Sequence, residues 1–225
     1  MCQVFTDTRH WRVERAIYRL VGVDPGTEQR WTTYALSALA LGAASIAFLW
    51  ALIMAQPWLP WSQGRGMHWH TALNTAVSFV TNTNWQSYSG ESTMSYLTQM
   101  AGLTWHNFIS AAAGIGVALA LARGLTRRPG PIGQRTIGNF WVDVLRSILY
   151  VLLPISMLGT LLMVSQGVIQ NLSPYREITT LEGTKQLLAM GPVASQEAIK
   201  LLGTNGGGFF NANSAHPFEN PTALT

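Results

Sequence analysis

Charged residues are scarce in this sequence. They make up 11% of its 225 residues, whereas about a quarter of the residues in a soluble domain are charged. Hydrophobic residues make up 48%, and nine residues are Trp, more than the core of a soluble domain of this size needs. The composition therefore points away from a soluble globular domain.

Cysteine and nucleotide-binding motifs are also missing. Cys2 is the single cysteine, which excludes an intrachain disulfide and a cysteine-rich metal site. The first 32 residues are polar and charged with no apolar core segment, so no cleavable signal peptide is expected. Gly206-Gly207-Gly208 is followed by no Lys-Ser/Thr pair, so these glycines are better explained by positive φ or close packing than by a phosphate site.

Long uncharged apolar segments decide the class of protein. Residues 33–55, 101–122 and 147–169 contain no charge. Each is longer than the roughly 20 residues that cross the hydrocarbon core of a bilayer. The sequence therefore predicts an all-α membrane protein with three spans, with Pro154 kinking the third.

Basic residues gather in two places and predict an orientation. Ten of the 14 Lys and Arg residues either precede the first span or lie between the second and the third. They are Arg9, Arg12, Arg15, Arg19, Arg30, Arg123, Arg127, Arg128, Arg135 and Arg146. Since Lys and Arg concentrate on the cytoplasmic side, these segments are expected inside. The net charge of +4 is explained by loops near anionic lipid, and no nucleic-acid partner is expected.

Two uncharged polar stretches each follow a short helical segment. Residues 81–90 follow the segment 70–80, and residues 203–213 follow the segment 192–202. A helix of about 11 residues is roughly 16 Å long, so each segment reaches only half-way through a bilayer. Non-helical backbone at membrane depth occurs where it lines a cavity, and its carbonyl oxygens can replace the hydration shell of a cation. The pattern predicts two re-entrant pore half-helices, each with a selectivity-filter loop, in repeated units.

Other side chains near these stretches leave several interpretations open. Glu91 and Glu219 each lie just beyond a polar stretch, where they attract cations at an outer vestibule or act as solvated or capping carboxylates. Gln86 either presents its oxygen to a cation or braces the loop. Ser87 lacks a Gly-x-Ser-x-Gly setting, which makes an intramembrane hydrolase a weak hypothesis. Four histidines show no metal-ligand spacing and are better explained as surface or interface residues. They are His68, His70, His106 and His216.

Long motifs in both stretches resemble a known family. Phe79-Val-Thr-Asn-Thr-Asn-Trp-Gln-Ser-Tyr-Ser-Gly-Glu91 resembles the first selectivity-filter loop of the KdpA family of bacterial potassium-transporting ATPases. The second stretch, Gly203-Thr-Asn-Gly-Gly-Gly-Phe-Phe-Asn-Ala-Asn-Ser214 with His216-Pro-Phe-Glu-Asn-Pro-Thr222, is similar to its second loop. The resemblance implies a channel-like subunit with four repeats around one pore. Carried over by position, the potassium-binding residues are Asn82, Thr83, Asn84, Gln86, Thr204, Asn205 and Gly206.

The same resemblance implies partners and a location. Potassium, the transported ligand, would enter from the outside and pass to a KdpB-like P-type ATPase subunit, with KdpC-like and KdpF-like subunits and membrane lipid alongside. ATP and magnesium would bind the partner, so that no catalytic residue and no cofactor are expected in this chain. The implied location is the bacterial inner membrane, with the filter loops facing outside. A related self-standing potassium channel or symporter is the alternative, and an intramembrane enzyme a more distant one.

The expected organisation has four parts. Residues 1–32 form a cytoplasmic segment, residues 33–124 a first repeat, residues 125–146 a basic cytoplasmic loop and residues 147–225 an incomplete second repeat. Since the family has four repeats, the sequence is expected to be a fragment, a truncated product or a partial record.

Overall fold

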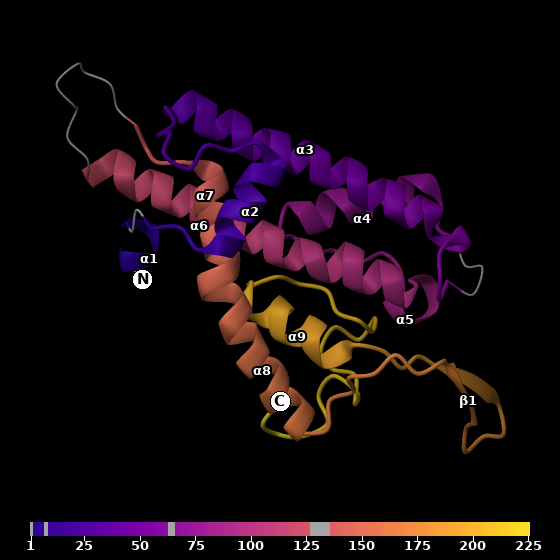
Figure 1. The fold of residues 1–225 in the computed structure, drawn as a ribbon. Helices are drawn as coiled ribbons and strands as arrows, with labels where there is room; N and C mark the ends of the chain where they lie inside the picture. Colours follow the sequence, from indigo (N-terminus) through magenta and orange to yellow (C-terminus); the bar gives the residue numbers. More distant parts are fainter. Residues whose placement is uncertain (1, 7–8, 63–65, 127–135) are drawn as a thin grey trace.

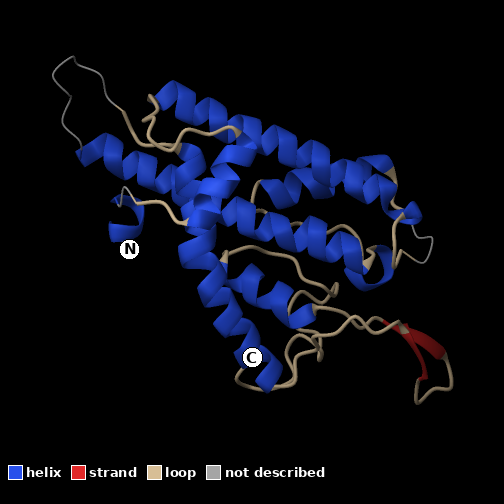
Figure 2. Cartoon of the chain, in the orientation of Figure 1, coloured by secondary structure: helices blue, strands red, loops and turns tan. Residues whose placement is uncertain are grey.

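The computed structural model describes residues 2–6, 9–62, 66–126 and 136–225. The described part is mostly helical, with one two-stranded antiparallel sheet that projects from the helical body (Figures 1 and 2). Three helical segments are long and apolar enough to cross a membrane: Trp31–Trp58, Thr98–Thr126 and Phe140–Ser165. The prediction of a helical membrane protein with three spans is confirmed.

The first repeat consists of two long helices with a short one between them. Helix α3 (Trp31–Ala55) is followed by a 3₁₀ turn (Gln56–Trp58), helix α4 (Trp69–Val80) and helix α5 (Gly90–Thr93). A π-helical segment (Thr98–Thr104) then leads into helix α6 (Trp105–Thr126). In Figure 1, α3 and α6 run alongside each other and α4 lies with them.

Helix α4 is held by an apolar core shared with its neighbours. Ala72, Ala76 and Phe79 on α4 pack against Leu49 and Ile53 on α3, and all five are buried. The small residues let the two helices approach closely, which favours helix packing in a membrane. This core fixes where α4 ends and hence where the polar stretch 81–90 begins.

The third membrane-spanning segment begins and ends earlier than the sequence predicts, at Phe140 and Ser165. Helix α7 (Phe140–Arg146), a π-helical segment (Ser147–Leu152) and helix α8 (Leu153–Ser165) form one continuous rod. The expected span 147–169 is therefore wrong at both ends. Asn139 caps α7 by accepting from the N–H of Trp141, and the left-handed Gly167 (φ 98°) follows α8. Because Pro154 has no N–H to donate, a π-helical turn directly before it fits the change in hydrogen-bond register.

A β-hairpin leads from α8 to the second half-helix. Strands β1 (Arg176–Thr179) and β2 (Lys185–Leu188) pair antiparallel, with Arg176 opposite Leu188. Helix α9 (Val193–Leu202) follows and lies beside α8 (Figure 1). The hairpin is mostly exposed.

Two ion pairs hold α7 to its neighbours, one partly buried and one buried. Asp143 on α7 accepts two hydrogen bonds from Arg123 on α6, at 2.5 and 2.9 Å, and a third from Tyr34 on α3 at 2.9 Å. Arg146 on α7 donates to Glu14 at 2.9 Å. These bonds bring the end of α6 and the starts of α3 and α7 together.

Glu14 lies on helix α2 (Arg12–Val21), which follows the short helix α1 (Cys2–Thr6). Glu14 and Tyr18 are the residues of α2 that are buried. The apolar residues Leu20 and Val21 of the same helix are exposed. The N-terminal segment is thus attached by buried polar contacts.

The basic loop predicted at 125–146 is only partly described. Arg127, Arg128 and Arg135 lie outside the described residues, and residues 140–146 form α7. Gln29 N–H donates to the Gly138 carbonyl at 2.7 Å, and Ile137 N–H donates to the Gln29 carbonyl at 3.0 Å. The segment before the first span and the segment before the third therefore lie together.

Candidate functional site

The two polar stretches begin with turns of the same construction. We call residues 81–86 turn 1 and residues 203–208 turn 2. In both turns, the backbone N–H of the second residue donates to the carbonyl of the residue three positions earlier. The backbone N–H of the third residue donates to the carbonyl five positions earlier. The four bonds are Asn82 to Phe79 (3.4 Å), Thr204 to Leu201 (3.2 Å), Thr83 to Ser78 (3.0 Å) and Asn205 to Lys200 (3.0 Å). The backbone thus matches Asn82-Thr83-Asn84 with Thr204-Asn205-Gly206.

Both turns hold residues in the left-handed region of φ. Three residues other than glycine have positive φ: Asn82 (62°), Asn84 (55°) and Thr204 (52°). Gly207 has a φ of 69°. Positive φ is uncommon outside glycine and costs about 1–3 kcal/mol, and such residues cluster at functional sites. The unusual backbone of each turn is therefore a reason to look for function there.

Each turn follows the C-terminal end of a half-helix. Turn 1 follows α4, which ends at Val80, and turn 2 follows α9, which ends at Leu202. The last carbonyl groups of a helix carry about half a negative charge in sum, which favours a cation near them. Both half-helices thus contribute negative potential at the turns.

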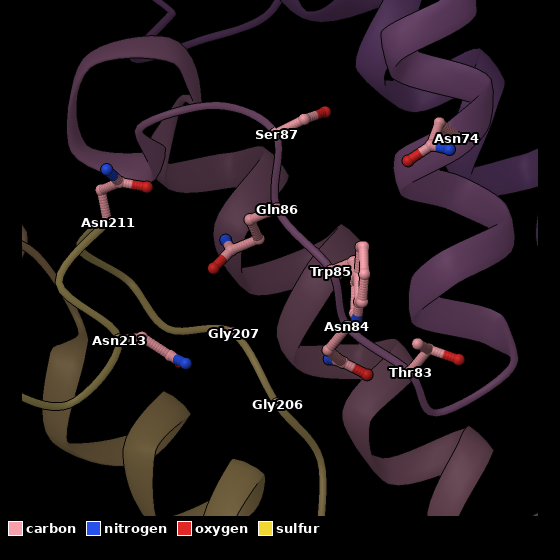
Figure 3. A pocket seen from close by; sticks show the side chains of 10 residues that line it. All are labelled: Asn74, Thr83, Asn84, Trp85, Gln86, Ser87, Gly206, Gly207, Asn211 and Asn213. Carbon is pink, nitrogen blue, oxygen red and sulfur yellow. The ribbon is translucent and has the colours of Figure 1, made fainter.

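The side-chain amide of Gln86 connects turn 1 to turn 2. Its oxygen accepts from the Gly208 N–H at 2.9 Å, and its nitrogen donates to the Gly208 carbonyl at 3.0 Å. Figure 3 shows this side chain pointing across to the stretch that contains Gly206 and Gly207. Of the two interpretations left open by the sequence, the contacts match the brace between loops.

A second connection joins both turns to α6. The Asn82 side-chain oxygen accepts from Ser110 at 2.9 Å and also from the Asn205 amide nitrogen. Asn205 donates to Ser110 as well, at 3.2 Å. Asn84, 2% exposed, donates to Asn107 on the same helix at 2.6 Å. The Asn82 oxygen and the amide nitrogens of Asn84 and Asn205 are therefore engaged, whereas the side-chain oxygens of Asn84 and Asn205 are buried without a hydrogen-bond partner among the residues that the structure describes.

A cavity of about 420 Å³ lies between the turns. Its lining contains amides, hydroxyls and backbone but no charged side chain. The lining residues are Asn74, Thr83, Asn84, Trp85, Gln86, Ser87, Gly206, Gly207, Asn211 and Asn213 (Figure 3). Gly206 and Gly207 have no side chain, so they present main chain to this space. An uncharged cavity lined by oxygen-bearing groups suits a cation that sheds its water onto carbonyls.

Close packing explains the glycines of turn 2. A Cβ on Gly206 would lie 3.2 Å from the Thr83 carbonyl oxygen, and a Cβ on Gly207 would lie 3.1 Å from that of Asn84. The backbones of the two turns thus approach each other too closely for side chains between them, as the sequence analysis predicts for these glycines.

The carboxylates beyond the turns differ in their surroundings. Glu219 is 3% exposed and accepts hydrogen bonds from backbone N–H groups just after turn 2. Glu91 accepts from the Asn211 N–H at 2.8 Å in an exposed position. Glu219 is therefore a capping carboxylate, and neither residue lines the cavity.

The residues of the predicted site are brought together, with supporting residues that the sequence analysis did not name. Asn107 and Ser110 were missed because they lie within an apolar span. Polar residues inside a membrane span are rare and mark functional sites, so this signal was present. That the seven predicted residues bind potassium stays a prediction.

The rival chemical sites gain no support. Ser87 lines the cavity, and no hydrogen bond joins its hydroxyl to a histidine in the described part of the chain. The rings of His68 and His70 lie 3.7 Å apart between their centres. Among the described residues, no group of three or more His, Cys, Asp and Glu side chains could hold a metal ion.

Comparisons with known proteins identify the family. The family model described as "Potassium-transporting ATPase A subunit", KdpA, matches residues 1–225. Similar proteins named "Potassium-transporting ATPase potassium-binding subunit" occur in Pectobacterium atrosepticum (60% identical over 222 residues), Salmonella arizonae (58% over 215) and Edwardsiella ictaluri (62% over 216). These alignments cover 98%, 95% and 95% of this chain.

The same alignments cover 39%, 38% and 37% of the three relatives, so the chain spans about two fifths of their length. The model match and the identities agree with the two turns and the three spans described above. The chain belongs to the KdpA family, the A subunits of potassium-transporting ATPases.

Proposed function

We propose that this chain supplies two potassium-selective turns to the translocation path of an ATP-driven potassium uptake system. The observation that carries the proposal is the matched pair of turns around an uncharged cavity, each following the C-terminal end of a half-helix. Potassium would be coordinated mainly by main-chain oxygens of Thr83, Asn84 and Gly206, because these residues line the uncharged cavity between the turns.

The full set of proposed potassium-binding residues follows the sequence prediction with one change in role. Asn82, Thr83, Asn84, Thr204, Asn205 and Gly206 supply backbone. Gln86 lies just below as a brace whose two polar atoms already bond Gly208.

The chain would hold the turns toward the outside of a bacterial inner membrane. Supporting this orientation, the basic segment before α3 is hydrogen-bonded to the segment before α7, through Gln29 with Ile137 and Gly138. Both segments carry an excess of Arg, which supports a position at the cytoplasmic face. Turn 1 and turn 2 follow the C-terminal ends of α4 and α9.

Energy for uptake would come from a partner. A KdpB-like P-type ATPase subunit would bind ATP and magnesium, with KdpC-like and KdpF-like subunits completing the assembly. In this proposal the chain performs no covalent chemistry. It binds potassium from outside and delivers it through the membrane to the ATPase subunit.

A chimeric transporter tests the proposal. The matching segment of the potassium-binding subunit of Pectobacterium atrosepticum, 60% identical over 222 residues, is replaced by this chain within the complete complex. We expect ATP-driven potassium uptake and growth at low potassium. A chimera that assembles but shows no potassium-stimulated ATP hydrolysis would refute the proposal, and potassium flux without ATP would favour the self-standing channel instead.

A further inference from the structure

Glu219 is a charged side chain that is almost completely buried. It is 3% exposed, and burying a carboxylate is costly unless hydrogen bonds compensate it. One oxygen accepts from the N–H groups of Phe209 (2.8 Å) and Phe210 (3.1 Å), and the other accepts from the N–H of Ser214 (2.9 Å). The carboxylate is thus directed at the backbone that follows turn 2.

The backbone that Glu219 holds is the same backbone that contacts turn 1. Gly208, next to Phe209, makes the two hydrogen bonds with Gln86. The Phe209 carbonyl accepts from Gln99 at 3.2 Å, which lies in the π-helical segment before α6. Side chains from three separate parts of the chain therefore fix Gly208–Phe210.

Glu219 is itself held in a fixed environment. Lys200 and Glu197 on α9, 2% and 1% exposed, form an ion pair at 2.7 Å. Lys200 also donates to the Ser214 hydroxyl, which donates to Glu197 at 3.2 Å. The ring of His216 stacks on Phe210 at 3.9 Å between centres. A carboxylate among packed and bonded groups has little room to move.

We propose that Glu219 is a positioning residue that sets the spacing between turn 2 and turn 1, and thereby the size of cation that the site accepts. The inference rests on the proposed function. It assigns Glu219 no contact with the ion: the carboxylate acts through the N–H groups of Phe209, Phe210 and Ser214. The spacing matters because Gly206 and Gly207 lie against the Thr83 and Asn84 carbonyls.

The test compares three variants in the complete chimeric transporter. Glu219→Gln keeps one acceptor oxygen but places an NH₂ group against the Ser214 N–H. Glu219→Asp keeps the charge and shortens the side chain. Glu91→Gln is the matched control, because Glu91 accepts from the Asn211 N–H of the same loop in an exposed bond. ATP hydrolysis is measured against potassium and against rubidium, and complex assembly is measured by size-exclusion chromatography.

For Glu219→Gln we expect the half-maximal potassium concentration to rise roughly tenfold, since a hydrogen bond to a charged group contributes about one factor of ten or more. Discrimination between potassium and rubidium should fall, while the rate at saturating potassium stays within about twofold. Glu219→Asp should show a smaller change in the same direction, and Glu91→Gln a smaller one still.

Three results would overturn the inference: unchanged discrimination in an assembled Glu219→Gln complex, an equal effect of Glu91→Gln, or loss of assembly in both Glu219 variants. The last would assign Glu219 to the fold of the subunit as a whole. Failure of the unmodified chimera to respond to potassium would instead refute the proposed function, so the two failures are distinguishable.

Discussion

Gln86 and Gly208 form a reciprocal pair of hydrogen bonds between two turns that are far apart in sequence. The Gln86 oxygen accepts at 2.9 Å and its nitrogen donates at 3.0 Å, so that one side chain satisfies both backbone groups of a buried glycine. An unsatisfied buried polar group costs about 1–3 kcal/mol. The pair is therefore a direct energetic link between turn 1 and turn 2.

Replacing Gln86 should weaken potassium binding. Gln86→Leu leaves the N–H and the carbonyl of Gly208 unpaired, and we expect the potassium concentration for half-maximal ATP hydrolysis to rise about tenfold or more. Gln170→Leu is the matched control, because the Gln170 amide forms a similar reciprocal pair with Ser195 in an exposed position. Equal effects of the two variants would contradict a special role for Gln86.

The glycines of turn 2 should tolerate no side chain. Gly207→Ala places a Cβ 2.9 Å from the Gln86 side-chain oxygen at a φ of 69°. Gly183→Ala has the same kind of strain, at a φ of 79°, but meets nothing within 4 Å. Potassium uptake by the chimera should fall at least tenfold for Gly207→Ala and little for Gly183→Ala, since the latter adds only the about 1–2 kcal/mol of left-handed strain. A similar loss in both would show that strain alone is responsible.

A charge in turn 2 should abolish transport. In Gly206→Arg the added side chain starts 3.2 Å from the Thr83 carbonyl, and its charge repels a cation. Arg176→Ala removes a charge from the exposed strand β1 and should leave growth at limiting potassium nearly unchanged. Growth of the Gly206→Arg strain at the same rate would refute the placement of turn 2 beside the ion path.

The partly buried ion pair between the long helices should matter for stability. Asp143→Asn leaves the partly buried Arg123, 15% exposed, without its anionic partner, and the cost approaches that of a fully buried pair, about 3–5 kcal/mol. Glu177→Gln breaks the exposed pair with Lys185, whose side chains are 55% and 79% exposed, and such pairs contribute about 0–1 kcal/mol. Thermal unfolding of the detergent-solubilised chimera should therefore shift markedly for Asp143→Asn alone. Equal shifts in unfolding temperature for Asp143→Asn and Glu177→Gln would show that the Arg123–Asp143 pair contributes no more than an exposed pair.

Attachment of the N-terminal segment should depend on pH. Burial by itself raises the pKa of Glu14, but the Trp11 N–H and the side chains of Arg146 and Tyr150 outweigh it, and the pKa lies below its ordinary value of 4.5. The charged form is favoured in the folded state, so the contribution is complete above pH 4.5 and is lost as pH falls through the lowered pKa.

Hydrogen exchange of the α2 amides measures this attachment. Protection should fall as the pH is lowered below 4.5, after correction for the intrinsic exchange rate. Glu14→Gln should lower protection at neutral pH and flatten its pH dependence. A variant with the protection and pH profile of the unmodified chain would rule out Glu14 as the attachment.

The sequence predicts some elements closely and others not at all, for physical reasons. The half-helix predicted at 70–80 is α4, Trp69–Val80, because apolar periodicity ends where the polar turn begins. The first span, predicted at 33–55, runs from Trp31 to Ala55 for the same reason. The third span starts at Phe140 instead, since Asp143 and Arg146 resemble loop charges until their buried partners are known.

The positions of the two turns could be predicted from the sequence, but the side-chain hydrogen bonds that connect them could not. Uncharged polar residues at membrane depth indicated the two turns, and the glycines indicated close approach. The partner of Gln86 could not be predicted, because a hydrogen bond between residues 122 positions apart leaves no local pattern. The exposed hairpin was missed because short strands that bury little show no clear alternation.

The contact among Asn82, Asn205 and Ser110 has an evolutionary consequence. After an internal duplication, two copies of a motif ordinarily diverge independently. Here the Asn82 oxygen accepts from both other residues, so a substitution at Asn82 removes a hydrogen-bond partner from Ser110 and from Asn205 at once. Homologous lineages should therefore change these positions jointly, and the two copies should carry a shared mutational history rather than separate ones.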